Sequence, residues 1–211
     1  MDQLLIDGKA DAKVTLILAH GAGAPMDHSF MNTIAAALAG KDVRVVRFEF
    51  PYMAARRTAG KRGAPDREPV LMQTWREVIA KLGTPSRIVI GGKSMGGRIA
   101  SMIADEAGVA GLICLGYPFH PPGAPTKLRT AHLEKLKTPA LILQGTRDSF
   151  GLPNEVAKYK LSSKICIAWI EDGDHSFKPR ASSGRTYDGN MNEAIAQMES
   201  FRASLKFPAR R

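Results

Sequence analysis

The sequence predicts a doubly wound α/β fold, in which a mostly parallel sheet carries helices on both faces. Three observations lead to this prediction. Short apolar runs bounded by Gly or Pro recur along the 211 residues, and stretches with the apolar spacing of helices lie between them. The connections are also long enough for crossover helices, which parallel neighbouring strands require because no tight turn can join them.

Each predicted element follows from one of these patterns. Six apolar runs are expected to form strands buried on both faces, at residues 14–19, 43–48, 87–90, 111–115, 140–143 and 165–170. The opening Leu4-Leu5-Ile6 adds an edge strand. Helical spacing of apolar residues occurs at 30–38, 71–82, 95–103 and 191–205. Because no repeat or linker interrupts this pattern, we expect one domain over residues 1–211.

Composition excludes several other classes of protein. No apolar run approaches the roughly 18 residues that a membrane span needs. The first residues lack the basic region of a signal peptide, so we expect a cytoplasmic protein with no membrane partner. Cys114 and Cys166 lie in apolar runs without metal-binding spacing, and we expect both to be reduced and packed as small hydrophobic side chains.

The chain is strongly basic, with a net charge of +10 that would attract anions or nucleic acid. The densest basic segment is residues 56–62, followed by Arg67, and a weaker one closes the chain at Lys206, Arg210 and Arg211. Neither segment interleaves aromatic residues, as a base-stacking surface would. We interpret them as a solvated loop and a frayed tail, so nucleic acid is a disfavoured partner. No sequence feature indicates an oligomeric state.

A nucleophile motif follows the strand predicted at 87–90. The sequence Gly92-Lys93-Ser94-Met95-Gly96 contains G-x-S-x-G, a strand-to-helix turn that projects its serine into a cleft at the carboxyl ends of the strands. A phosphate-binding P-loop is the competing interpretation, because a Gly-Lys-Ser sequence ends that motif too. It would need a glycine five residues before Gly92, where Arg87 stands.

A serine nucleophile requires a base and a carboxylate that orients the base. Asp148 and His175 follow the strands predicted at 140–143 and 165–170, in the chain order Ser, Asp, His that this turn implies. Asp172 and Asp174 are rival carboxylates, but their closeness to His175 in sequence suits them better to fixing its loop. We therefore predict a catalytic triad of Ser94, Asp148 and His175, which needs no metal and no organic cofactor.

Two backbone amides should stabilise the oxyanion of the tetrahedral intermediate. One is the amide of Met95, directly after the nucleophile. The other is expected in the small-residue loop after the first central strand, at Ala22 or alternatively at Gly23. We expect His20, in the same loop, to brace the loop without a catalytic role.

These motifs make the chain resemble the α/β-hydrolases, and in particular their small, cap-less bacterial members. The matching segments are LAHGAG at 18–23, FPYM at 50–53, GKSMGGR at 92–98, GTRD at 145–148 and DH at 174–175. They resemble the dienelactone-hydrolase-like branch and, more closely, hydrolase-like proteins related to a vertebrate testis-expressed protein and to a subunit of the non-specific-lethal chromatin complex. Dienelactone hydrolases use a cysteine where this chain has Ser94, which argues against a dienelactone substrate.

The resemblance also locates the loops that would select a substrate. A cap domain of this superfamily is usually inserted where residues 116–125 form a short stretch with four prolines, so we expect no lid and a shallow, open site. Candidate lining residues are Met26, Met53, Tyr117, Phe119 and His120, although core packing explains each of them equally well. The segment 54–68 is expected to be a loop near the same face, which either attracts an anionic substrate or is simply mobile.

Two functions of different class are consistent with the sequence. The first is a serine hydrolase acting on a small-molecule ester or related acyl substrate through an acyl-enzyme at Ser94. The alternative is a non-catalytic hydrolase-fold protein that binds a partner through its basic surface, because a fold alone does not guarantee activity. The complete set of predicted catalytic residues favours the hydrolase.

Overall fold

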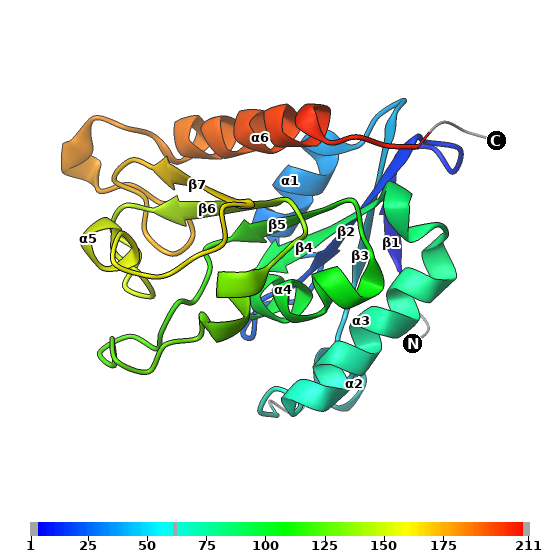
Figure 1. The fold of residues 1–211 in the computed structure, drawn as a ribbon, viewed down its shortest axis with the longest axis horizontal. Coiled ribbons are helices and arrows are strands. Elements are labelled where there is room, and N and C mark those ends of the chain that lie inside the picture. The colour runs from blue at the N-terminus through cyan, green and yellow to red at the C-terminus, as the bar shows by residue number, and fades with distance from the viewer. Residues whose placement is uncertain (1–3, 61–62, 209–211) are drawn as a thin grey trace.

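A computed structural model describes residues 4–60 and 63–208 of the chain, which contain a seven-stranded sheet of order β1-β3-β2-β4-β5-β6-β7 (Figure 1). Every neighbouring pair of strands is parallel except β1 with β3. The predicted fold class is therefore confirmed. The strands are β1 (Leu5–Asp7), β2 (Val14–Ala19), β3 (Val43–Phe48), β4 (Ile88–Lys93), β5 (Gly111–Leu115), β6 (Ala140–Gly145) and β7 (Ile165–Ile170).

Helices cover both faces of the sheet (Figure 1). Apolar side chains on one face, such as Leu16 and Leu18, pack toward α1 (Ser29–Leu38) and α6 (Tyr187–Ser204). Alternate residues of the same strand, such as Ile17, pack on the other face toward α3 (Glu68–Leu82) and α4 (Met95–Ala107). This alternation follows from the two-residue period of a strand and produces a core on each side of the sheet.

Shorter helices connect these layers. They are α2 (Pro51–Ala59), α5 (Pro153–Val156) and the 3₁₀ turns η1 (Pro85–Arg87), η2 (Ala131–Lys135) and η3 (Ala181–Ser183). Between β5 and η2 the chain forms no α-helix, so residues 116–130 contain no helical cap. Within the described ranges, no helix is both long and apolar enough to cross a membrane.

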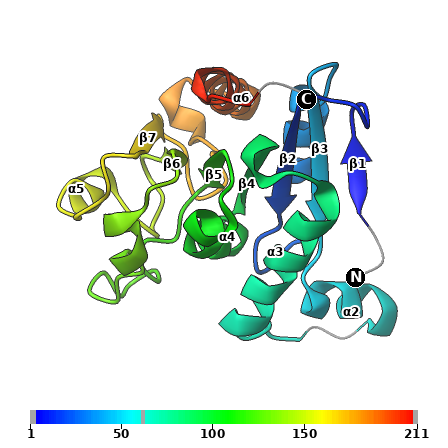
Figure 2. The same cartoon turned by 45° about the vertical axis from the view of Figure 1, so that its right-hand side comes forward.

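The sheet edges differ from the prediction in two details. β1 lies beside β3 at one end of the sheet, as expected for the opening apolar residues (Figure 2). β7 closes the other end and is half-buried rather than buried on both faces, because it has a neighbour on one side alone. Cys114 of β5 is buried as expected, whereas Cys166 of β7 is exposed, and both thiols are free.

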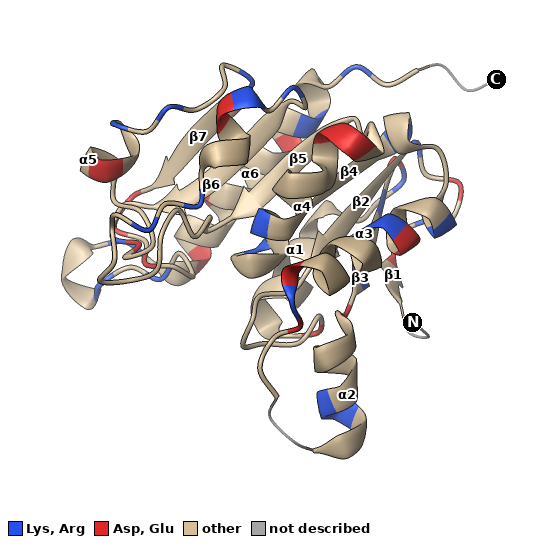
Figure 3. Cartoon of the chain, turned by 60° about the horizontal axis from the view of Figure 1, so that its bottom comes forward, with Lys and Arg blue, Asp and Glu red and all other residues tan. Residues whose placement is uncertain are grey.

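The segment predicted as the loop 54–68 contains most of a helix. Pro51 begins α2 in its first turn, where a missing amide hydrogen costs nothing, and Gly60 ends it in a left-handed conformation (φ 64°). α2 projects from the body of the molecule (Figure 3). Lys61 and Arg62 of the basic segment lie outside the described residues, as do Arg210 and Arg211 of the tail.

The described arginines of α2 are engaged within the protein. The Arg57 guanidinium pairs with the carboxylates of Glu49 at 2.7 Å and Asp27 at 2.6 Å. Arg56 lies over the ring of Tyr52, 5.3 Å from its centre. Part of the positive charge that was expected to attract an anionic substrate is therefore engaged within the protein itself.

Candidate active site

Ser94 lies in the sharp turn between β4 and α4, and its backbone has a conformation that residues other than glycine rarely adopt. Its φ is 51° and its ψ is −115°, and such a backbone costs about 1–3 kcal/mol at a residue other than glycine. A Cβ atom at Gly92 would lie 2.2 Å from the carbonyl oxygen of Ala19, and one at Gly96 would lie 2.5 Å from that of His20. The turn that presents the serine therefore requires glycine on both sides.

His175 lies between Ser94 and Asp148. Its Nε2 is 2.9 Å from Oγ of Ser94, and its Nδ1 is 2.7 Å from Oδ2 of Asp148. The three residues follow β4, β6 and β7, whose carboxyl ends lie at the same edge of the parallel sheet. In this geometry a carboxylate can orient an imidazole that takes the serine proton.

Asp148 is fully buried, and two further contacts hold its carboxylate. The side-chain amide of Gln144 donates to Oδ2 at 2.9 Å, and the backbone amide of Phe150 donates to Oδ1 at 2.9 Å. The ring of Phe150 in turn packs 4.3 Å from that of His175. The acid and the imidazole are therefore both held in one orientation by residues that the sequence did not single out.

The rival carboxylates Asp172 and Asp174 bind within the loop that carries His175. Asp172 accepts hydrogen bonds from the backbone amide and the side chain of Arg180, at 2.6 and 2.7 Å. The Arg180 guanidinium holds the pKa of Asp172 well below its usual range. Asp174 accepts from two amides later in the loop, so both residues stabilise the loop and neither contacts the imidazole.

The two backbone amides expected to bind an oxyanion are free to donate a hydrogen bond to a ligand. In the part of the chain that the structure describes, the amides of Ala22 and Met95 donate no hydrogen bond. Met95 is the first residue of α4, where helix geometry leaves the N–H without a partner. Ala22 lines both cavities that adjoin Ser94, whereas Gly23 lines one of them, which favours Ala22 over Gly23 as the second donor.

Two buried side chains brace the loop that contains Ala22. Nε2 of His20 accepts a hydrogen bond from the amide of Phe50 at 3.1 Å while Nδ1 donates to the Gly21 carbonyl at 2.6 Å, and burial lowers the pKa of His20. The hydroxyl of Tyr52 donates to the Ala22 carbonyl at 3.0 Å. Tyr52 was not assigned this role from the sequence, because the contact joins the start of α2 to a loop about 30 residues earlier in the chain.

Lys93 precedes Ser94 and holds the backbone of His175. Its Nζ donates to the carbonyl oxygen of His175 at 2.6 Å and lies 5.7 Å from the ring centre of Phe30. Gly116 leaves room for this contact, since a Cβ there would lie 2.9 Å from Nζ and 2.8 Å from the same carbonyl oxygen. Burial lowers the pKa of Lys93 to about 8.

Two cavities, each of about 770 Å³, adjoin Ser94. The Lys93 cavity is lined by Lys93, Phe30, His175 and the loop 21–25. The Arg129 cavity lies between the start of α4, the start of α3 and the loops after β5 and β6. Its lining includes Met95, Arg98, Pro118, Arg129 and Phe150, together with residues of the 65–71 segment.

The five side chains expected to line the site line neither cavity. All are buried, with no more than 3% exposed, and they are Met26, Met53, Tyr117, Phe119 and His120. The rings of Tyr117 and Phe119 pack against each other within the core on the α3 and α4 side of the sheet. Core packing therefore explains these residues, and the expectation that they line the site is corrected.

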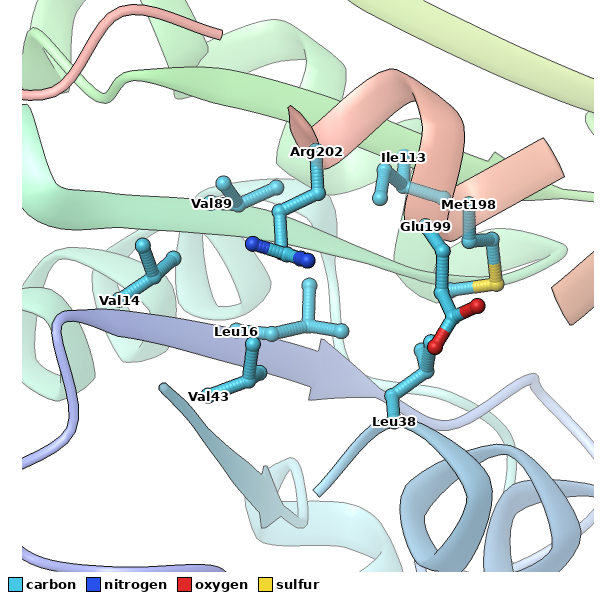
Figure 4. A pocket seen from close by; sticks show the side chains of 9 residues that line it. All are labelled: Val14, Leu16, Leu38, Val43, Val89, Ile113, Met198, Glu199 and Arg202. Atoms are coloured by element: carbon cyan, nitrogen blue, oxygen red, sulfur yellow. The ribbon is translucent and has the colours of Figure 1, made fainter. Parts of the chain in front are cut away.

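A further cavity, of about 380 Å³, lies near the amino ends of β2 to β5, away from the carboxyl ends that carry Ser94 (Figure 4). It is lined mainly by apolar side chains from the first residues of the strands and from α6, with Glu199 and Arg202 at its side. No triad residue borders it, so it is separate from the chemistry described above. Across residues 4–60 and 63–208, no cluster of three His, Cys, Asp or Glu side chains is arranged to hold a metal ion.

Comparison with known proteins identifies the family and the fold of the chain. A family described as an alpha/beta hydrolase domain matches residues 12–203. A lid-less α/β serine hydrolase from Xanthomonas campestris has a TM-score of 0.70 at 20% identity, covering 99% of this chain and 90% of that chain. An alpha-beta serine hydrolase homologue from Coxiella burnetii has a TM-score of 0.65 at 22% identity, with coverages of 95% and 90%.

Dienelactone hydrolase from Anabaena variabilis is also similar in structure. Its TM-score is 0.63 at 18% identity, covering 96% of this chain and 92% of that chain. At these identities the three likenesses concern the fold.

Proposed function

Since the chain belongs to the alpha/beta hydrolase domain family, we propose that it is a serine hydrolase that cleaves an ester or a related acyl substrate. The observation that carries this proposal is the continuous hydrogen-bonded path from Ser94 through His175 to the buried Asp148. The names of two structural neighbours, a serine hydrolase from Xanthomonas and a serine hydrolase homologue from Coxiella, support the same activity.

The reaction follows from the positions of these groups. His175 Nε2 takes the proton from Ser94 as Oγ attacks the carbonyl carbon, and Asp148 stabilises the imidazolium that forms. The amides of Ala22 and Met95 bind the developing oxyanion. His175 then gives its proton to the leaving group, and an acyl-enzyme remains at Ser94. A water molecule activated by His175 releases the acid and restores the serine.

Labelling with a fluorophosphonate probe, followed by mass-spectrometric site mapping, tests the proposal. We expect an adduct on Ser94 of the wild type and none on Ser94→Ala. We expect His175→Ala to label more slowly by at least about 100-fold, because the hydroxyl then lacks its base.

Ser101→Ala is a matched control for this experiment. Ser101 is a buried serine whose Oγ lies 2.8 Å from Nε2 of His132, but it lies inside α4 and adjoins neither cavity. This variant should label like the wild type. A folded wild-type protein without an adduct would refute the hydrolase and favour the alternative binding protein, for which salt-sensitive retention on heparin is the next measurement.

A further inference from the structure

One of the positively charged side chains that line the Arg129 cavity, that of Arg129 itself, has no partner among the described residues. In the described residues, the guanidinium of Arg129 forms neither a hydrogen bond nor an ion pair, although it shares a cavity with Ser94 and Met95. The other guanidinium of this cavity, that of Arg98, is paired with the carboxylate of Glu68 at 2.8 Å. Positive charge is therefore uncompensated at Arg129 and compensated at Arg98.

The backbone of Arg129 is held in place although it belongs to a loop. Its amide donates to the carbonyl oxygen of Phe119 at 2.8 Å, and its carbonyl oxygen accepts from the hydroxyl of Tyr117 at 2.9 Å. Both partners are fully buried. A side chain that starts from a fixed backbone loses less conformational entropy when it binds a ligand.

The surroundings of the Arg129 guanidinium disfavour its charge. Burial, and then the neighbouring Arg98 cation, lower the pKa of Arg129, yet a guanidinium remains charged at neutral pH. The carboxylates of the same cavity are occupied elsewhere. Glu68 binds Arg98, and Asp66 accepts a hydrogen bond from the amide of Tyr52 at 2.9 Å. An anion from outside the protein would supply the missing partner.

We propose that Arg129 binds a carboxylate of the substrate, so that the enzyme prefers esters carrying a free carboxylate over neutral esters of the same size. A guanidinium matches a carboxylate with two parallel hydrogen bonds, which also fixes the direction of the bound molecule. The inference rests on the proposed function, because it places the reacting carbonyl group at Ser94. Lys93, in the other cavity, is already bound to the His175 carbonyl.

Matched pairs of esters test the preference. One pair is p-nitrophenyl hemiglutarate and p-nitrophenyl pentanoate, in which the acyl group carries the charge. The other is 4-carboxyphenyl butyrate and phenyl butyrate, in which the leaving group carries it. We expect the wild type to favour the charged member of at least one pair by about 10- to 100-fold in kcat/KM, the range of a charge-assisted hydrogen-bonded pair.

Three variants locate the source of that preference. Arg129→Gln should remove it, so that the two members of each pair are hydrolysed at similar rates, and Arg129→Lys should retain part of it because the charge remains. Arg76→Gln is the control, since Arg76 is an exposed arginine of α3 that pairs with Glu106 at 2.7 Å and lines neither cavity. A wild type without preference, or a preference that persists in Arg129→Gln, would overturn the inference.

A binding measurement separates this inference from the proposed function. In Ser94→Ala protein, calorimetry should detect tighter binding of glutaric acid monoanilide than of pentananilide, and the additional Arg129→Gln substitution should abolish the difference. Equal binding of the two anilides by Ser94→Ala protein would count against the carboxylate site. Charge-selective binding by a protein that hydrolyses no ester would refute the hydrolase alone, and hydrolysis without charge selectivity would refute the carboxylate site alone.

Discussion

Lys93 carries its charge in a half-buried position with no carboxylate paired to it in the described structure. Its pKa falls from 10.5 to about 8 on folding, because burial disfavours the ammonium. Between these two values the unfolded chain binds more protons than the folded protein, so the contribution of Lys93 to the free energy of unfolding rises with pH. The full rise amounts to about 3 kcal/mol, at 1.36 kcal/mol for each pKa unit.

Comparison of the wild type with Lys93→Met isolates this contribution. We expect the free energy of unfolding of the wild type to increase relative to that of the variant between about pH 7 and about pH 10, as measured by urea denaturation. Lys13→Met is the control, because Lys13 is a surface lysine with 70% of its side chain exposed. A difference between the wild type and Lys93→Met that is constant with pH would show that the Lys93 ammonium is as well solvated in the folded protein as in the unfolded chain.

At this scale the sequence predicted which three side chains lie together, but not the residues that hold them. Ser94, Asp148 and His175 stand directly after apolar runs, and parallel strands bring such positions to one edge of the sheet. The contact of Tyr52 joins two segments about 30 residues apart that meet only in the folded chain, and that of Gln144 depends on the turn that brings Asp148 back to the end of β6. The aromatic residues after β5 were misplaced for the same reason, because an apolar residue in a loop is exposed or buried according to tertiary packing.

The turn between β4 and α4 is the element on which the site depends. A Cβ at Gly96 would meet two backbone oxygens, that of His20 at 2.5 Å and that of Ala19 at 2.7 Å, so α4 would have to move away from β2. We expect Gly96→Ala to lower the free energy of unfolding by about 1–3 kcal/mol, as for other overpacked sites. It should also reduce fluorophosphonate labelling of Ser94, because Met95 and its amide would shift.

Gly40→Ala is the matched substitution for this prediction, because a Cβ at Gly40 would meet no atom within 4 Å. Its unfolding temperature should lie close to that of the wild type, since surface changes of this kind usually alter stability by no more than about 0.5 kcal/mol. Equal unfolding temperatures for the two alanine variants would contradict the close packing described for the turn.

Elements with strong periodicity were predictable, and those defined by their neighbours were not. The alternation of strands and helices follows from apolar spacing that is visible in the chain. The end of α2 was predicted as part of a loop because the segment 54–68 as a whole is rich in Arg, Lys, Gly and Pro, although Pro51 and Gly60 are typical helix boundary residues. The exposure of β7 depends on its being the last strand of the sheet, which the length of an apolar run does not reveal.

The whole molecule carries a net charge of +10, spread over several elements rather than gathered in one basic segment (Figure 3). The field of such a charge attracts anions at a distance and is screened by salt. We therefore expect kcat/KM for carboxylate esters to fall when the ionic strength rises from about 10 mM to about 150 mM, across which the Debye length shortens from about 30 Å to about 8 Å.

Neutral esters provide the control for this measurement, because their hydrolysis should not depend on the field. Arg129→Gln should retain most of the salt dependence, since it removes one charge of many while it removes the local contact entirely. A salt dependence that is the same for charged and neutral esters would indicate an effect of salt on the enzyme itself and would contradict attraction of the substrate.

The positive φ of Ser94 also affects the stability of the folded protein. Glycine adopts this conformation without strain, so Ser94→Gly would relieve the turn. The strain at Ser94 is therefore a cost to stability that the fold itself does not require.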